Sequence, residues 1–296
     1  MSEFLAIKTP LVSPILQFHH KMGEVGVGPP YETDLSTNGL PYVRIGKDKD
    51  PLVIFTSGSP DMSVPRGFML RQFVDGAKLF AKDYTVYFVK RKRGLTPGYT
   101  TWQMANDYAV FITEEIGKPC HVLGISAGGF IAEHFAASYP HLVRKLILTI
   151  AGTQLRGDGR QRVIDWLVHT QNCQYRRLLT SMYTAASDTP FTRFGASLLA
   201  QVIGTIARPA LEDMIDFAIL LDALLNHDGH PSLPKIACPT LIIGGELDIF
   251  YPPAMLHEMV KLIPNAKVSI YPDVGHGLVE LRKKRFEEDV LGFLKK

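Results

Sequence analysis

Short apolar runs alternate with amphipathic stretches along most of the 296-residue chain. Continuous apolar runs of this length are typical of strands that are buried on both faces of a sheet. They predict strands at residues 40–45, 51–56, 84–89, 120–123, 145–150, 240–243 and 267–271. Apolar residues at three- and four-residue spacing predict helices at residues 68–80, 101–116, 130–135 and 282–294. This alternation predicts an α/β fold, with a mostly parallel central sheet and helices on both faces.

One long segment departs from the alternation. Between Thr153 and Lys235 no stretch has the pattern of a strand. One helical face is formed by Val163, Trp166, Leu167 and Thr170, and a second by Leu211, Met214, Ile215, Ala218, Ile219 and Leu225. Each apolar stripe must be buried against another part of the protein. We therefore expect an inserted helical unit at residues 153–235, and a core made of residues 1–152 and 236–296.

The composition argues against several classes of protein. The chain is 46% hydrophobic and 21% charged, and its net charge of +3 is too small to indicate binding to nucleic acid or to an anionic membrane. Three cysteines without a CxxC motif argue against a disulfide framework or a zinc site, and Cys120 and Cys238 are expected to be buried. Neither a signal peptide nor a membrane span is evident, so a cytoplasmic protein is expected. The oligomeric state is left open.

Two other local patterns are expected to have no binding role. The basic run at residues 90–93 is interpreted as a solvated strand end rather than a phosphate site. The glycines at positions 23, 26 and 28 do not form a nucleotide loop, because no strand precedes them and Pro29-Pro30 follow where a helix would begin.

The most informative stretch is Gly-Ile-Ser-Ala-Gly at residues 124–128, between a predicted strand and a predicted helix. It fits the G-x-S-x-G pattern of a nucleophile elbow, in which a strained turn holds the serine hydroxyl clear of the sheet. Strand and helix then lie so close that small residues are needed two positions before and after the serine. The N-terminus of the helix also suits a developing oxyanion. Ser126 is therefore a candidate nucleophile.

A serine hydroxyl needs an adjacent base, and the base needs an orienting partner. His276 lies between glycines directly after the last predicted strand, and Asp248 directly follows the preceding strand. All three candidates thus follow strands, at the sheet edge where sites in such folds form. Glu246 is the rival acid, and it is expected to be solvated.

The other histidines have weaker claims. His121 and His134 are expected to be packing residues. His227 and His230 border the insertion, where they could reach a substrate.

In their order and approximate spacing, the elbow, the G-x-x-D-x-x-x-P run at residues 245–252 and the Gly-His-Gly at residues 275–277 resemble the α/β-hydrolase family. The resemblance covers about residues 40–296. It implies that Ser126 is the nucleophile, that His276 is the general base and then the acid, and that Asp248 orients the imidazole. It also implies that residues 153–235 form a lid over the site.

The loop Ser57-Gly58-Ser59-Pro60 lies where this family often has His-Gly-x-Pro. By this resemblance, the backbone N–H groups of Ser59 and Ala127 form the oxyanion hole. The chain departs from the family pattern at Ser57, which replaces the histidine.

Together these features predict a carboxylesterase-like serine hydrolase that forms an acyl-enzyme on a small or medium, largely apolar ester or lactone. Trp166, Met214 and Phe217 are expected to contact the substrate, and neither a metal nor an organic cofactor is implied. A serine nucleophile argues against haloalkane dehalogenase and epoxide hydrolase chemistry. The alternatives are a C–C bond hydrolase, a cofactor-free haloperoxidase or perhydrolase, an acyltransferase, or a non-catalytic ligand-binding receptor on the same scaffold.

Overall fold

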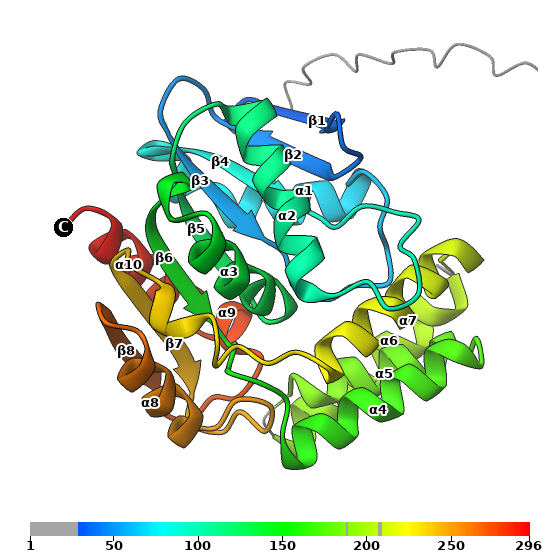
Figure 1. Ribbon diagram of the computed structural model, residues 1–296. Coiled ribbons are helices and arrows are strands. Elements are labelled where there is room, and N and C mark those ends of the chain that lie inside the picture. Colours follow the sequence, from blue (N-terminus) through cyan, green and yellow to red (C-terminus); the bar gives the residue numbers. More distant parts are fainter. Residues whose placement is uncertain (1–28, 188, 207–208) are drawn as a thin grey trace, which may run out of the picture.

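The central element of the computed structural model is a sheet of 8 strands in the order β1-β2-β4-β3-β5-β6-β7-β8 (Figure 1). The structure describes residues 29–187, 189–206 and 209–296. The strands are β1 (Tyr31–Leu35), β2 (Pro41–Ile45), β3 (Asp50–Phe55), β4 (Tyr84–Val89), β5 (Cys120–Ile125), β6 (Val143–Thr149), β7 (Thr240–Gly245) and β8 (Ala266–Tyr271). Pairs β1–β2 and β2–β4 are antiparallel, and the remaining neighbours are parallel. The predicted fold class is thus confirmed.

Helices cover both faces of the sheet. In Figure 1, α2 (Thr101–Phe111), α3 (Ala127–Ser138) and α8 (Pro253–Leu262) lie in front of the sheet. Behind it lie α1 (Gly67–Ala77), α9 (Leu278–Leu281) and α10 (Lys283–Leu294). Each layer buries its own apolar cluster against the sheet, so the strands between them are apolar on both faces.

Short turns connect or extend these helices. They are the 3-10 turns Phe80–Lys82, Pro140–Leu142 and Leu233–Lys235, and the π turn Ile112–Ile116 that continues α2. At the start of α2, Thr100 and Gln103 form a capping box, in which each side chain accepts from the backbone of the other. This cap explains why the helix begins directly after the Gly98-Tyr99 turn.

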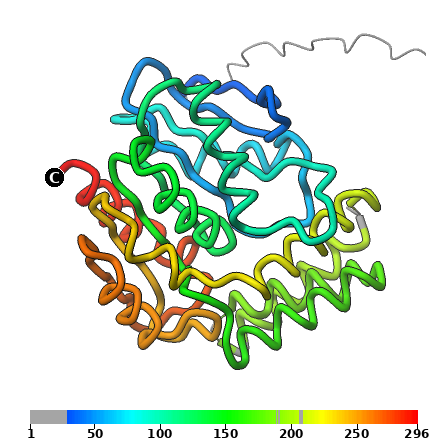
Figure 2. Tube along the Cα trace, viewed as in Figure 1, coloured from blue at the N-terminus to red at the C-terminus, as the bar shows by residue number. Residues whose placement is uncertain are grey.

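A helical insertion separates β6 from β7. It consists of α4 (Gly157–Gln171), α5 (Tyr175–Ala185), α6 (Pro190–Ile206) and α7 (Leu211–Leu225). The trace in Figure 2 leaves the sheet after β6, runs through these helices and returns to β7. The predicted orientation of α7 is wrong in part. Leu211 and Ile215 are 61% and 51% exposed, whereas Met214, Phe217 and Leu221 are buried, because the buried stripe repeats from residue 214 rather than from residue 211.

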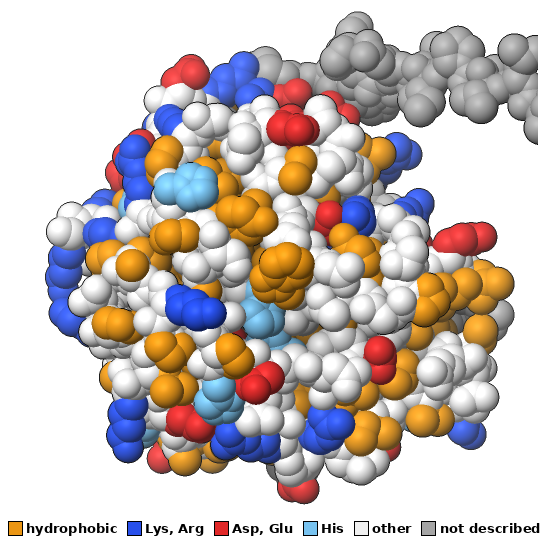
Figure 3. Space-filling view, viewed as in Figure 1, with side chains coloured by type: hydrophobic (Ala, Val, Ile, Leu, Met, Phe, Trp, Pro, Cys, Tyr) orange, Lys and Arg blue, Asp and Glu red, His pale blue; other side chains and the backbone are white. Residues whose placement is uncertain are grey.

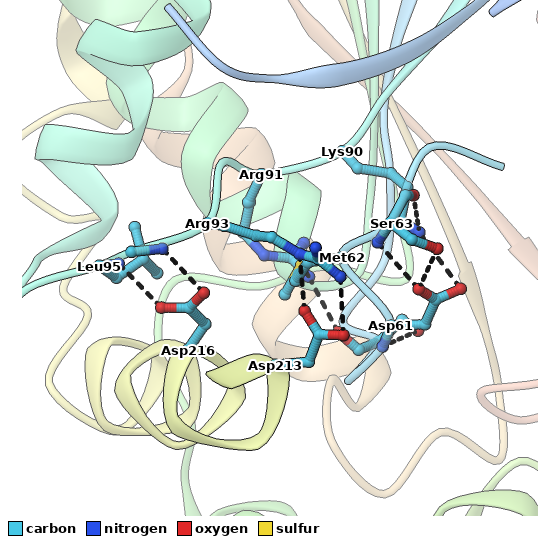
Figure 4. Close-up of polar contacts among 11 residues, drawn as sticks. Asp61, Met62, Ser63, Lys90, Arg91, Arg93, Leu95, Asp213 and Asp216 are labelled. Atoms are coloured by element: carbon cyan, nitrogen blue, oxygen red, sulfur yellow. Dashed lines mark hydrogen bonds and ion pairs between the residues drawn. The ribbon is translucent and has the colours of Figure 1, made fainter. Parts of the chain in front are cut away.

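The basic run at residues 90–93 is solvated only in its second half, so the prediction of a solvated strand end is wrong for Lys90 and Arg91 (Figure 4). Lys90 and Arg91 follow β4 and are only 5% and 2% exposed. Lys90 donates to the carbonyl of Ser63 at 2.9 Å, and Arg93 forms a 2.8 Å ion pair with Asp213 of α7. These partners are distant in sequence, so the charge run alone does not reveal them.

Strand β1 was not predicted, because its sequence, YETDL, carries two carboxylates and lies half-buried at the sheet edge. The glycines at positions 23, 26 and 28 lie outside the described residues. Cys120 is buried as predicted, and Cys238 is only partly so.

The visible surface mixes side chains of both charges with apolar ones, and apolar atoms gather on the helical insertion at the right of Figure 3. The exposed large apolar residues of α6 are Phe191, Phe194, Leu198, Leu199 and Val202. Among the described residues, no helix combines the length and the hydropathy that a membrane span requires.

Candidate active site

The turn between β5 and α3 has the geometry of a nucleophile elbow. Ser126 has φ +52° and ψ −117°, a backbone conformation that residues other than glycine rarely adopt. A Cβ at Gly128 would lie 2.0 Å from the carbonyl oxygen of Phe55, and one at Gly124 would lie 2.8 Å from Cβ of Ala132. Because both contacts are shorter than real Cβ atoms allow, only glycine fits at these positions. Helix, strand and serine are therefore held in one arrangement.

The predicted nucleophile, base and acid meet at the carboxyl edge of the sheet. Oγ of Ser126 lies 3.1 Å from Nε2 of His276, and Nδ1 of His276 lies 2.9 Å from Oδ2 of Asp248. Asp248 follows β7 and His276 follows β8, in loops at the ends of parallel strands. An imidazole that donates from Nδ1 to the carboxylate leaves Nε2 as acceptor for the serine hydroxyl. The three side chains thus form a continuous hydrogen-bonded chain.

The surroundings of the carboxylate fix its direction. The Asp248 side chain is fully buried, and its second oxygen accepts from the N–H groups of Phe250 at 2.8 Å and Tyr251 at 3.3 Å. The His276 side chain retains 16% exposure, so the imidazole can face a substrate. Glu246, the rival acid, is exposed and accepts from the N–H of Asp273.

Two aromatic residues beside the imidazole were missed in the sequence. The rings of Phe250 and Tyr251 lie 4.7 Å and 5.8 Å from the ring of His276. Burial and the nearby carboxylates of Asp248 and Glu133 raise the pKa of Tyr251 well above its ordinary value, so its phenol stays protonated. Both residues stand within the G-x-x-D-x-x-x-P run, and this position close to Asp248 was the feature of the sequence that could have indicated them.

The loop after β3 lies against the elbow. A Cβ at Gly58 would be 3.6 Å from Cβ of Ala127, so the two backbone segments predicted to form an oxyanion hole are neighbours. The N–H of Ala127 belongs to the first turn of α3, where backbone donors have no helical acceptor. The hydroxyl of Ser59 accepts from the N–H of Asp61 at 3.2 Å, which shapes the loop.

The three residues of the insertion that were expected to contact a substrate lie in different surroundings. The ring of Phe217 is 3.8 Å from the Cβ position of Gly58, so this residue of α7 roofs the loop after β3. Trp166 packs on Phe250 at 5.4 Å between centroids and donates to Ser181 at 3.0 Å. Met214 lines a cavity of ≈ 1020 Å³ among the inserted helices. The lining of that cavity does not include Ser126, Asp248 or His276.

A second buried polar cluster lies below the insertion. His227 contacts Oγ1 of Thr101 at 2.9 Å and Oε2 of Glu133 at 3.1 Å, and its ring stacks on Phe130. Burial raises the pKa of Glu133 well above its ordinary value and lowers that of His227 well below its own. Burial thus disfavours the charged form of both groups. The structure places His227 against α3 rather than beside Ser126.

His134 and His230 also form hydrogen bonds with other side chains of the protein. His134 contacts the hydroxyl of Ser232 at 2.8 Å, and His230 bonds to the carboxylates of Asp228 and Glu258. Within residues 29–187, 189–206 and 209–296, no group of three or more histidine, cysteine or carboxylate side chains could hold a metal ion.

Comparisons with known proteins agree on the fold. A sequence model described as the alpha/beta hydrolase family matches residues 53–288. The polyketide synthase ThaQ of Burkholderia thailandensis is 28% identical over 190 residues, which are 58% of this chain and 8% of the synthase. Monoacylglycerol lipase ABHD6 of Rattus norvegicus is 27% identical over 192 residues, 60% of this chain and 55% of the lipase. The chain thus spans less than two thirds of either relative.

A solved structure covers more of the chain. The enol-lactonase from Burkholderia xenovorans LB400 has a TM-score of 0.70 at 18% identity, and the match covers 93% of this chain and 100% of that one. At this level of identity the likeness shows the fold. The same sheet and helical insertion are therefore present in a structure that shares few residues with this chain.

Proposed function

Because this chain belongs to the α/β hydrolase family, we propose that it is a serine hydrolase that cleaves carboxylic esters or lactones. The observation that carries the proposal is the hydrogen-bonded chain from Ser126 through His276 to the buried Asp248. A base within 3.1 Å of the hydroxyl, itself oriented by a carboxylate, is the arrangement that turns serine into a nucleophile.

The first half of the reaction forms an acyl-enzyme. Oγ of Ser126 attacks the substrate carbonyl carbon while Nε2 of His276 takes the hydroxyl proton. The oxygen of the tetrahedral intermediate bears the negative charge and accepts from the N–H groups of Ser59 and Ala127. The intermediate then collapses, the bond to the leaving oxygen breaks, and His276 gives its proton to the departing alcohol.

The second half releases the acid. A water molecule loses a proton to Nε2 of His276 and attacks the acyl carbon, which restores the same oxyanion. Collapse of this intermediate breaks the bond to Oγ, and the imidazole returns the proton to Ser126. Asp248 stabilises the imidazolium in both halves, and the two N–H groups that bond to its other oxygen keep it in place. Apart from water and substrate, every group in these steps belongs to the chain.

The insertion supplies the apolar side of the proposed site. We assign the hydrolase core to residues 1–152 and 236–296 and a lid to residues 153–235. Phe217 and Trp166 support this division, because one roofs the loop after β3 and the other packs on the aromatic wall beside His276. An apolar roof favours a small to medium, largely apolar substrate. The name of the rat relative, a monoacylglycerol lipase, is in keeping with ester cleavage.

Pre-steady-state kinetics test the proposal. With p-nitrophenyl acetate and butyrate, we expect a burst of p-nitrophenol equal to the enzyme concentration, followed by slower turnover as the acyl-enzyme hydrolyses. Esters that share an acyl group but differ in their leaving alcohol should then have the same kcat. A panel of lactones measured beside them assigns the substrate class.

Three results would contradict the assignment. The first is no turnover of any ester or lactone by folded protein that binds them saturably, which supports a ligand-binding receptor. The second is preferential transfer of the acyl group to an added alcohol or to hydrogen peroxide. The third is ester turnover that Ser126→Ala leaves unchanged, since Oγ of Ser126 would then not be the nucleophile.

A further inference from the structure

Arg91 is buried directly behind the loop that carries the proposed oxyanion donor. It follows β4 and is 2% exposed (Figure 4). One terminal nitrogen of its guanidinium approaches the carbonyl oxygens of Thr56 at 3.5 Å and Ser57 at 3.3 Å. The other approaches the carbonyl oxygen of Ser59 at 3.4 Å and the sulfur of Met62 at 3.7 Å. The guanidinium thus faces the backbone of residues 56–59.

The charge of Arg91 is not neutralised in the usual way. Across the part of the chain that the structure describes, no carboxylate forms an ion pair with it, and its Nε has no hydrogen-bond partner. Asp216 acts on it only at longer range, because both of its oxygens already accept from the N–H groups of Gly94 and Leu95. An arginine stays protonated in proteins, and a buried unpaired charge is costly. Packing alone does not account for such a residue.

The contacts of Arg91 with carbonyl oxygens orient the two peptide groups that flank the peptide between Gly58 and Ser59. A peptide group is planar, so its N–H points away from the group that its carbonyl faces. The contact with the Ser57 carbonyl orients the peptide between residues 57 and 58, and the contact with the Ser59 carbonyl orients the peptide that ends at Pro60. The peptide between Gly58 and Ser59, which carries the proposed donor, is thereby held from both ends.

Such a restraint matters because Gly58 has no Cβ. A glycine adopts backbone conformations that other residues cannot, so the peptide after Gly58 can turn over at little steric cost. A flip would present a carbonyl oxygen to the substrate in place of the Ser59 N–H. An oxyanion would then meet an acceptor rather than a donor.

We propose that Arg91 is a positioning residue that holds the loop at residues 56–59 in the orientation needed for oxyanion binding. The inference rests on the proposed serine hydrolase function. Arg91 touches neither substrate nor Ser126, and it acts through the carbonyls of Thr56, Ser57 and Ser59. Its positive charge, one loop away from the developing oxyanion, acts in the same direction.

The test compares Arg91→Met and Arg91→Lys with wild type. Methionine fills much of the volume but removes the charge and all donors, so kcat should fall roughly 10²-fold, as for the loss of one oxyanion donor, while KM changes less than about threefold. Lysine keeps the charge but cannot contact the carbonyls of Ser57 and Ser59 together. Its kcat should fall roughly tenfold, between the two other proteins.

A trifluoromethyl ketone separates positioning from general damage to the structure. It adds to the serine and places an oxyanion in the same site, so its Ki should rise by the same factor as kcat/KM falls. The affinity for butyrate, a product that carries no tetrahedral oxyanion, should stay within about threefold. A merely structural role would weaken both ligands together.

Lys90→Met is the matched control, since Lys90 is equally buried and basic but donates to Ser63. It should keep kcat within about threefold of wild type. If Arg91→Met does not fold, Arg91→Lys and Lys90→Met still give the comparison, with thermal unfolding as the check. The inference is overturned if a folded Arg91 variant keeps wild-type kcat, or if ketone and butyrate affinities fall together. If Ser126→Ala remains active, the proposed function itself fails, whatever the Arg91 variants do.

Discussion

Two carboxylates in the loop after β7 stand two residues apart and have opposite surroundings. Asp248 is buried and bonded to His276, whereas Glu246 is exposed and accepts from the backbone of Asp273. A carboxylate can hold an imidazole in one tautomer only if it is fixed itself, and the N–H groups of Phe250 and Tyr251 fix Asp248.

Replacing each carboxylate by its amide tests this difference. Asp248→Asn should lower kcat by roughly 10³–10⁴-fold, because the amide stabilises the wrong imidazole tautomer. Glu246→Gln should change kcat less than about threefold and serves as the control. Steady-state kinetics on one p-nitrophenyl ester, with circular dichroism to confirm folding, are sufficient. A larger loss in the Glu246 variant would mean that the acid is misassigned.

Single residues differed in how well the sequence revealed them. Ser126, Asp248 and His276 stand in motifs whose glycines are demanded by local geometry, so their proximity followed from short patterns. The burial of Lys90 and Arg91 did not, because it depends on carbonyls of another loop and on the packing of α7. A run of four basic residues ordinarily faces water, and nothing adjacent in sequence indicates otherwise.

At the scale of an element, β5 carries a histidine that the elbow does not use. His121 is 7% exposed, and its ring meets Tyr84 edge-on at 5.6 Å. Burial lowers the pKa of His121 to about 4, and the cations of Lys145 and Arg144 act in the same direction. An unfolded histidine titrates near roughly 6.5. Between these values the unfolded chain binds a proton that the folded chain does not.

The folded state should therefore lose stability as pH falls. The contribution of His121 is fully present above about pH 6.5 and is lost progressively toward about pH 4, by up to about 3 kcal/mol. His121→Phe removes this titration, so its unfolding free energy should fall less between pH 7.5 and pH 5 than that of wild type. Urea denaturation at both pH values measures the difference, with the exposed His141→Phe as control. Equal losses in wild type and His121→Phe would refute the buried-histidine account.

Elements were predictable where one local pattern dominates. Strands β3, β4 and β7 are apolar on both faces, so continuous runs located them closely. The separate helices α5 and α6 were not resolved in the sequence. In α6, Phe191, Phe194 and Leu198 are exposed, so its apolar spacing does not mark a buried face.

At the scale of the whole molecule, the insertion is fastened to the core from both sides of the site. On one side α7 is held by Asp213 and Asp216, which bond to Arg93 and to the backbone after β4. On the other, Trp166 of α4 packs on Phe250, and Arg160 of α4 donates to the last turn of α7, which ties the two inserted helices to each other. The buried face of α7 therefore has a fixed position above the loop after β3.

This placement predicts where substrate preference is determined. Phe217→Ala should change the ratio of kcat/KM between short and long esters by about 10–200-fold, the usual effect of reshaping a hydrophobic pocket. Ile215→Ala alters the same helix at a residue that is 51% exposed, and it should leave the ratio unchanged. The ratio is measured with p-nitrophenyl acetate and octanoate. Equal effects of the two variants, or none, would mean that α7 does not line the substrate site.

The central claim is that Ser126 is the nucleophile of a hydrolase, and intact-protein mass spectrometry after reaction with a fluorophosphonate tests it most directly. Wild type should gain one adduct, which peptide mapping places on Ser126, with complete loss of esterase activity. Ser126→Ala should gain none, and its kcat should be roughly 10⁴–10⁶-fold lower, as when a serine of this kind is removed. An adduct on folded Ser126→Ala, or a folded wild type that stays unlabelled, would contradict the account.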